Sequence, residues 1–399
     1  MKNLGTLYRY ELKKLLGRKM AWISVLVLAA VMVCSALPNW NSGGSQASIT
    51  DRDGNTISRY VSAVQQQELA RAGNRRISGQ VMDEPFFERV RAAADGNGIY
   101  QIREMFDQYS FFYLVDSSYQ GPYGMISLDA QLDPKETTAA QFYEARQKQL
   151  ALQWADLAEG DAAYWQAMEA RVEKPFVYRA IDGYQKLLYD VFGLSCILPL
   201  AAAVCVCGVF SDERRTRADA LIFSSRYGHS PQYLAKVLAG TTVAAAVSVL
   251  IIGANTAAVL LVRGADGFDA ALQLSVLESS LPLTMGQAVC ILFSLLVLYG
   301  ILSGGVTMLI SVLTGNTVAA MACPVVLLIV QAWLRLGTQA AEYLPNQLFN
   351  AIPTLRNVHL VHFLGGTWNN LQFGYLLYGG LAAGLLFLCR PGWRRWSRG

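Results

Sequence analysis

Long apolar runs alternate along the chain with short blocks that hold most of its charges. A helix that crosses a bilayer needs roughly 20 mostly apolar residues, and each of these runs approaches or exceeds that length. The predicted spans are residues 21–37, 191–210, 237–262, 283–313, 318–336 and 373–389. This pattern predicts an all-α polytopic membrane protein with about six transmembrane helices.

The polar region between the first two predicted spans, residues 38–185, is expected to form a mostly helical outer domain. Phe142, Leu150 and Trp154 recur near helical spacing, Asp161 is a candidate helix cap, and Pro175 is expected to begin a helix that leads into the second span. Residues 41–55, rich in Ser, Gly and Asp, predict a loop. The predicted plan is an N-terminal helix (1–19), a span (20–37), the outer domain (38–185), a span (186–210), a loop (211–236), four spans (237–389) and a tail (390–399).

Composition supports the membrane prediction and gives the orientation. The chain is 53% hydrophobic and 16% charged, whereas soluble proteins carry about 25% charged residues. Lys and Arg cluster in residues 2–19, 214–236 and 390–398, and such clusters mark the cytoplasmic side. Six spans place these three segments on one side, so both termini are expected in the cytoplasm and the outer domain outside. The net charge of +4 forms no basic face of the kind that binds nucleic acid.

Signatures of catalysis and of metal binding are missing from the sequence. It contains no GxxxxGK[ST] phosphate-binding loop, no GxSxG and no HExxH, so the chain is not predicted to be an enzyme or to hold a cofactor. His359 and His362 lie three residues apart without a nearby carboxylate or cysteine, which favours interfacial histidines over a metal site. All cysteines fall in apolar runs, which excludes a disulfide framework in the outer domain; they are Cys34, Cys196, Cys205, Cys207, Cys290, Cys323 and Cys389.

No acidic or basic residue falls in the interior of a predicted span; Arg335 is near the outer end of the fifth. Ion-coupled transporters usually carry ionisable groups at mid-membrane, so energy for any uphill transport is expected to enter from outside the bilayer. Two further patterns each allow two interpretations. Gly300/Gly304 and Gly380/Gly384 have the spacing of close helix packing within one bundle or at a dimer face. The aromatic run at residues 109–113 suits either a domain core or a hydrophobic-substrate surface.

Two cytoplasmic segments carry more specific patterns. In the first, leucines alternate with Arg9, Lys13 and Lys14, which predicts an amphipathic helix in the inner interface that turns at Gly17 into the first span. The second, residues 210–240, joins charges of both signs to a short Leu/Ser stretch and a lysine before the third span. Mixed charge suits docking onto a protein more than onto anionic lipid, although these arginines also suffice to enforce topology. The candidate docking residues are Glu213, Arg214, Arg217, Asp219, Leu221, Ser224, Ser225, Arg226, Tyr227 and Lys236, and those of the N-terminal helix are Tyr10, Glu11, Lys13 and Lys14.

In order and spacing these segments resemble permeases of type-2 ATP-binding-cassette (ABC) exporters, and most closely bacterial members with a large extracellular domain between the first two spans. The resemblance implies that the loop is a coupling helix docked on a separate ATPase subunit, which binds ATP and Mg, and that the N-terminal helix is an elbow helix. It also implies a bacterial plasma-membrane location, contact with lipid, a second permease (identical or similar), and export of a lipid-like, peptide or hydrophobic substrate. Residues 314–316 depart from the pattern, since so short a turn offers little for a second docking contact.

The alternative hypothesis is a non-transporting membrane sensor or assembly protein whose outer domain binds a ligand or a partner. A secondary transporter ranks third because the spans lack buried charge. An associated ATPase distinguishes the first hypothesis from the other two.

Overall fold

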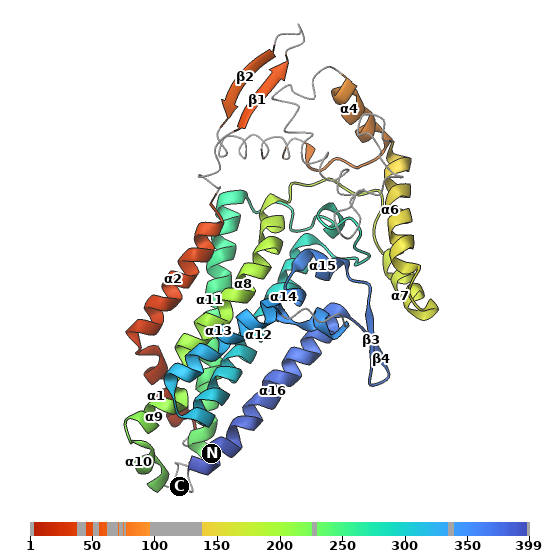
Figure 1. The fold of residues 1–399 in the computed structure, drawn as a ribbon. Helices are drawn as coiled ribbons and strands as arrows, with labels where there is room; N and C mark the ends of the chain where they lie inside the picture. Colours follow the sequence, from red (N-terminus) through yellow and green to blue (C-terminus); the bar gives the residue numbers. More distant parts are fainter. Residues whose placement is uncertain are drawn as a thin grey trace.

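A computed structural model of the chain describes residues 4–37, 45–50, 56–61, 71, 75, 77–95, 138–225, 230–333 and 339–396. Helices dominate this part, and strands occur in it only as two antiparallel hairpins (Figure 1). The aromatic run at 109–113 lies outside the described residues. The helices and strands are α1 (Leu4–Leu16), α2 (Lys19–Ser35), β1 (Ser45–Thr50), β2 (Thr56–Val61), α4 (Glu84–Asp95), α6 (Ala139–Trp154), α7 (Glu159–Glu169), α8 (Asp182–Val206), α9 (Gly208–Arg215), α10 (Asp219–Ser224), α11 (Ser230–Arg263), η1 (Leu272–Leu274), α12 (Met285–Thr314), α13 (Thr317–Trp333), η2 (Gln339–Tyr343), α14 (Pro345–Leu348), α15 (Ala351–Arg356), β3 (Leu360–Phe363), β4 (Gly366–Asn369) and α16 (Asn370–Trp396).

Within the described residues, four helical segments are long and apolar enough to cross a membrane: Asp182–Arg215 (α8 and α9), α11, α12 and α16. The pair α1 and α2, bent by 64°, passes the same test together and makes a fifth. The remaining predicted span falls on α13, which has 17 residues and is short for a crossing. The predicted all-α polytopic fold is confirmed, with two hairpins added. In the part of the chain that the structure describes, the long apolar helices number four to five, against about six predicted.

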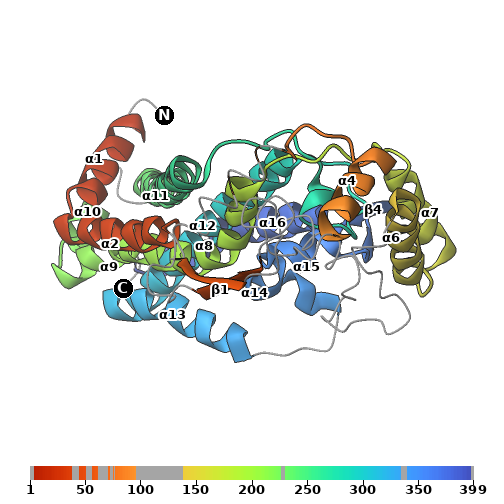
Figure 2. The ribbon, with the colours of Figure 1, turned by 90° about the horizontal axis from the view of Figure 1, so that it is seen from above.

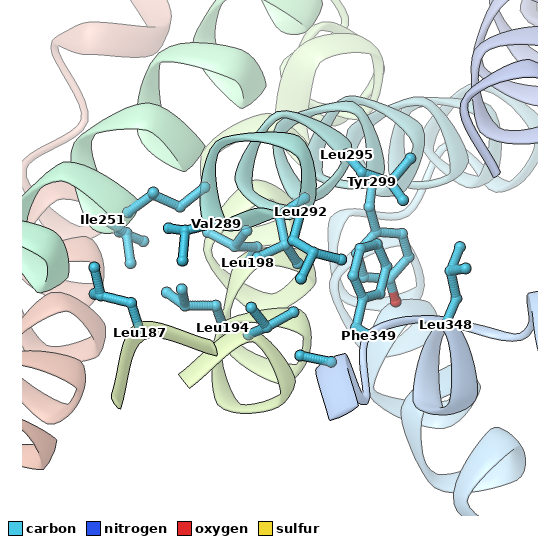
Figure 3. Close-up of a cluster of buried hydrophobic side chains, with 14 of the residues drawn as sticks. Leu187, Leu194, Leu198, Ile251, Val289, Leu292, Leu295, Tyr299, Leu348 and Phe349 are labelled. Atoms are coloured by element: carbon cyan, nitrogen blue, oxygen red, sulfur yellow. The ribbon is translucent and has the colours of Figure 1, made fainter. Parts of the chain in front are cut away.

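Helices α8 and α12 lie at the centre of the bundle, with α2, α11, α13 and α16 around them (Figure 2). Side chains of α8, α11 and α12, together with Leu348 of α14 and Phe349, form a buried apolar cluster (Figure 3). Helices α11 and α12 approach too closely at Gly300 and Gly304 for a larger residue. A Cβ on Gly300 would lie 2.0 Å from the Ser248 hydroxyl, and one on Gly304 would lie 2.8 Å from Ala244 on α11. This glycine pair therefore packs within the bundle. The labelled cluster residues are Leu187, Leu194, Leu198, Ile251, Val289, Leu292, Leu295, Tyr299, Leu348 and Phe349.

The outward faces of α2 and α13 expose large apolar side chains. Leu26 and Val27 on α2, and Val326 and Ile329 on α13, are each more than half exposed. Contiguous apolar surface of this kind is unfavourable in water and fits contact with lipid or another membrane helix. Gly380 and Gly384 on α16 also have open space beside them, so their role at a dimer face stays a prediction.

The bundle has two distinct ends. Both chain termini, α1 and α10 lie at one end, here called the terminal end (Figure 1). The β1–β2 hairpin, α4, α6 and α7 lie at or toward the other, the distal end, and the β3–β4 hairpin lies beside the bundle between the two ends. A 34-residue helix is about 51 Å long at 1.5 Å per residue, against a hydrocarbon core of about 30 Å. The segments Asp182–Arg215 and α11 have this length, so each is longer than the hydrocarbon core is thick.

Three local predictions within residues 38–185, the predicted outer domain, were wrong; the described part of this range is called the outer region. The helix entering the bundle begins at Asp182 and not at Pro175, because residues around Phe176 and Tyr178 are extended and bond to the backbone of Met82 and Gln80. Helix α7 begins at Glu159, so Asp161 lies inside its first turn and is not its cap. The predicted loop at 41–55 contains strand β1, which pairs with β2.

Candidate functional site

Three helices meet at the terminal end around a buried lysine. Lys236, near the start of α11, is 0% exposed, and its Nζ donates to Glu11 Oε1 at 3.1 Å, to Glu213 Oε1 at 2.5 Å and to the Val209 carbonyl at 3.1 Å. An ammonium group has three donors, so all of them are used. A buried charge is tolerated only when it is paired and hydrogen-bonded, and here α1 and α9 supply the partners.

The carboxylates of Glu11 and Glu213 also accept hydrogen bonds from side chains other than Lys236. Glu213 also accepts from Lys14 on α1 at 3.1 Å, and the Gln232 side chain donates to Glu11. Two carboxylates thus meet two ammonium groups, and the cluster is neutral. We call Glu11, Lys14, Glu213 and Lys236 the charge cluster; it fixes the N-terminal helix against the helices that flank the loop.

Helix α9 is tied to its other neighbours by polar contacts. Arg18, at the bend between α1 and α2, pairs with Asp212. The Ser211 hydroxyl lies 2.8 Å from that of Thr317, at the start of α13. Arg214 packs over the turn between α12 and α13, where Gly315 adopts a φ of +62° and where a Cβ would come within 2.8 Å of the arginine. The short turn at 314–316 therefore contacts Arg214, at the end of α9 that leads into the loop.

Helix α10 is anchored by aromatic side chains. Phe223 packs on Trp393 of α16 with ring centroids 4.8 Å apart, and Trp393 also contacts Phe210, which stacks on Tyr233. Phe210, Tyr233 and Trp393 are all buried. Aromatic pairs at these separations add about 0.5–1.5 kcal/mol beyond their buried area. The cluster fixes α10 to the ends of α9, α11 and α16.

The outer face of α10 is open. Leu221 is 76% exposed, and Ser224 and Ser225 are exposed, with hydroxyls that bond only to the carbonyls one turn back within the described residues. Arg217, also exposed, has a φ of +54° at the bend before α10. Leu221 therefore projects into solvent from a helix whose Phe223 is packed against the bundle.

The predicted site residues thus separate into two groups. Glu213 (6% exposed), Lys236, Glu11 and Lys14 form the internal charge cluster, whereas Arg217, Leu221, Ser224 and Ser225 face outward. Tyr10 and Lys13 are exposed on α1. Asp219 begins α10, its side chain is not described, and Arg226 and Tyr227 lie outside the described residues.

Sequence reasoning missed the residues that hold the loop in place. Phe223, Trp393 and Arg18 were not predicted as site residues. Glu11 carried a usable signal, since it lies four residues from both Leu7 and Leu15 and therefore on the apolar face of α1. An acid on such a face needs a buried cation.

The distal end has a second buried ion pair. Arg146 on α6 is 0% exposed and bonds through both terminal nitrogens to Glu169 on α7; it also donates to the carbonyls of Leu277 at 2.8 Å and Ser279 at 3.1 Å. Leu277 and Ser279 belong to the segment between α11 and α12. We call these contacts the distal clamp, because they join the two helices of the outer region to the bundle.

Further contacts seal the same junction. The Trp165 indole donates to the Val358 carbonyl at 2.6 Å, and the Ser279 hydroxyl donates to the Leu355 carbonyl at 2.7 Å. Burial raises the pKa of Tyr143 to about 12, which keeps its hydroxyl neutral while it donates to the Met82 carbonyl. Through Trp165, helix α7 is therefore joined to the segment between α15 and β3 in addition to the contacts of the distal clamp.

The family model described as ABC-2 family transporter protein matches residues 19–388. The chain belongs to the ABC-2 family of transporter proteins. In this ABC-2 family protein the matched range contains α10 and the Glu213–Lys236 pair, and it begins after Glu11 and ends before Trp393. No curated protein and no solved structure matches the chain. Family membership and the long apolar helices make the chain a multi-pass membrane protein of a transporter family.

Proposed function

We propose that this chain is the permease subunit of an ABC exporter and that α10 is its docking element for a separate ATPase subunit. The observation that carries the proposal is the exposed Leu221 on a helix fixed between the charge cluster and Trp393. ATP and Mg would be bound by the partner. In this proposal Glu213 and Lys236 position the loop, and the exposed face of α10 makes the contact.

The contacts at the terminal end support a coupling role. Force applied to α10 would pass through Phe223 to Trp393 on α16, and through the Glu213–Lys236 pair to α9 and α11. Helix α16 follows β4 directly at the other end, and His362 of the β3–β4 hairpin lies 3.0 Å from Asp161 on α7 (Figure 1). A continuous helix thus connects the docking face with the outer region.

Orientation and assembly follow from the same proposal. The terminal end, rich in Lys and Arg, lies in the cytoplasm of a bacterial cell, and the distal region lies outside. Two permeases, identical or similar, pair in the membrane with two ATPases, and the exposed faces of α2 and α13 contact lipid or the second permease. A neutral, apolar bundle suits a lipid-like, peptide or hydrophobic substrate.

Leu221→Glu is expected to reduce the co-purifying ATPase at least about tenfold, since a charge in a desolvated pocket costs more than the 1.4 kcal/mol that a factor of ten represents. The measurement is quantitative mass spectrometry of the tagged protein, extracted from its native host in mild detergent. Leu152→Glu is the matched control, because Leu152 is 73% exposed at the distal end. Equal ATPase recovery from the two variants would refute docking through α10, and no ATPase with the wild type would favour the sensor hypothesis.

A further inference from the structure

A cavity of about 370 Å³ opens at the distal end, beside the start of α12. One wall is the extended segment 171–179, which leads from α7 toward α8, and the other is formed by residues 269–273 and 282–287. Known small-molecule sites have volumes of about 300–1,000 Å³, so this cavity is large enough for a small ligand or a headgroup. It is distinct from α10 and from the charge cluster, which lie at the other end of the bundle (Figure 1).

The walls are fixed by backbone hydrogen bonds. Met82 N–H donates to the Phe176 carbonyl at 2.8 Å on one side, and Met285 N–H donates to the Ala270 carbonyl at 2.8 Å on the other. Thr284 caps α12 through a reciprocal contact with Gln287. The cavity is therefore largely formed before any ligand enters, which lowers the entropic cost of binding.

Charges of both signs line this space. Arg179 and Asp269 form an ion pair across it at 2.7 Å. Arg171 and Glu173 also line it and are exposed, and neither makes an ion pair within the part of the chain that the structure describes. A neutral wall that carries one unpaired guanidinium and one unpaired carboxylate is complementary to a zwitterion.

A buried amide adds a further acceptor. Gln273 lines the cavity and is 1% exposed, and its Nε2 donates to the carbonyls of Ser279 at 3.1 Å and Leu281 at 2.9 Å. Both hydrogens of the amide nitrogen are thereby used. No hydrogen bond to its Oε1 is seen from the described residues, which leaves one amide acceptor on the cavity wall.

We propose that this cavity binds a phosphoethanolamine group, presented as the headgroup of a membrane lipid. Arg171 and Arg179 match the oxygens of a phosphate, for which the guanidinium fork is well suited. Glu173, with the free acceptor of Gln273, receives the N–H donors of the ammonium. The cavity lies beside the first turn of α12, a helix long and apolar enough to cross a membrane, which favours a lipid as the source of the group. The inference is independent of any ATPase partner.

The test is calorimetric titration of the purified full-length protein, in detergent and without ATP. Dihexanoyl phosphatidylethanolamine and free O-phosphoethanolamine are the two probes, and dihexanoyl phosphatidylglycerol, which lacks the ammonium, is the comparison. Arg171→Gln and Glu173→Gln are each expected to weaken probe binding at least about tenfold, as loss of a charged hydrogen bond does. Arg89→Gln and Glu144→Gln remove the same charges from exposed positions outside the cavity and are expected to change it less than twofold.

Each outcome decides the proposal. Saturable binding of the lipid probe, weakened in both cavity variants only, supports it. Binding of O-phosphoethanolamine alone supports recognition of the group and assigns it to a soluble ligand. The proposal is overturned if neither probe binds the wild type, if the cavity variants behave like their controls, or if phosphatidylglycerol binds as tightly.

Discussion

Replacing Lys236 by methionine is expected to destabilise the folded protein by about 3–5 kcal/mol, the usual cost of removing one partner from a buried ion pair. The change leaves Glu11 and Glu213 close together, with Lys14 as the remaining cation of the charge cluster. Methionine fills nearly the same volume, so the loss reports charge and not packing. The measurement is an SDS titration of the protein in detergent micelles, followed by tryptophan fluorescence.

A matched control and a rescue separate pairing from a general effect. Lys13→Met removes a lysine from an exposed position of α1 and is expected to change stability by no more than about 0.5 kcal/mol. Adding Glu11→Gln and Glu213→Gln to Lys236→Met is expected to recover more than half of the loss, because neutral partners no longer leave buried charge uncompensated. A Lys236→Met protein as stable as Lys13→Met would contradict the structural role given to the cluster.

Arg146→Met is expected to release the outer region from the bundle, with a cost of about 3–5 kcal/mol by the same argument. Among the described residues, Glu169 then keeps only Lys174 as an ion-pair partner. The Leu277 carbonyl loses the Arg146 donor, whereas the Ser279 carbonyl still accepts from Gln273. Hydrogen exchange is expected to rise over α6 and α7 while the spans stay protected, since local openings need not unfold the whole protein.

The exposed Lys148→Met change in the same helix is the control, and it should leave exchange over α6 and α7 unchanged. Combining Arg146→Met with Glu169→Met removes both charges and is expected to restore part of the protection. If protection were lost equally across the bundle and the outer region, the clamp would not hold α6 and α7 independently of the spans, and the prediction would be wrong.

The clamp also has a defined dependence on pH. Burial acts to raise the pKa of Glu169, but the hydrogen bonds and charges of Arg146 and Lys174 outweigh it and hold the pKa below the ordinary 4.5. A carboxyl with a lowered folded-state pKa stabilises the folded state above its unfolded pKa, and that stabilisation is lost as pH falls through the folded value. Protection of α6 and α7 should therefore be full at neutral pH and decline below about 4.5. Comparison with Glu169→Gln isolates this effect from Glu278, whose pKa is raised by burial.

Hydrophobic patterning predicted the spans because a membrane requires long apolar helices. All six predicted segments fall on helices. The count was less predictable, because the 17-residue α13 differs from a full span by a few residues. The entry to α8 was also misplaced: Pro175 suits a helix start, but tertiary pairing of Phe176 and Tyr178 with residues 80–82 keeps the segment extended.

The candidate site was predicted as a segment and not as a set of contacts. The sequence pattern indicated the loop as a candidate docking segment, and Glu213, Lys236 and Leu221 were all predicted as docking residues. Only the three-dimensional packing shows that Glu213 and Lys236 form a buried pair while Leu221 is exposed. The partners of Lys236 lie 225 and 23 residues away, which no local pattern specifies. Arg146 did carry a signal, since it lies four residues from both Phe142 and Leu150 on the apolar face of α6.

The most direct test of the central claim is photo-crosslinking from position 221 in native membranes, without extraction. Leu221→p-benzoylphenylalanine is expected to capture an ATPase that carries a phosphate-binding GxxxxGK[ST] loop, because this side chain projects from the terminal end. Leu152→p-benzoylphenylalanine, equally exposed at the distal end, is expected to capture none. Capture of the ATPase at 221 alone is the predicted result. Absence of an ATPase adduct at 221, in cells where the protein is present in the membrane, would contradict the account.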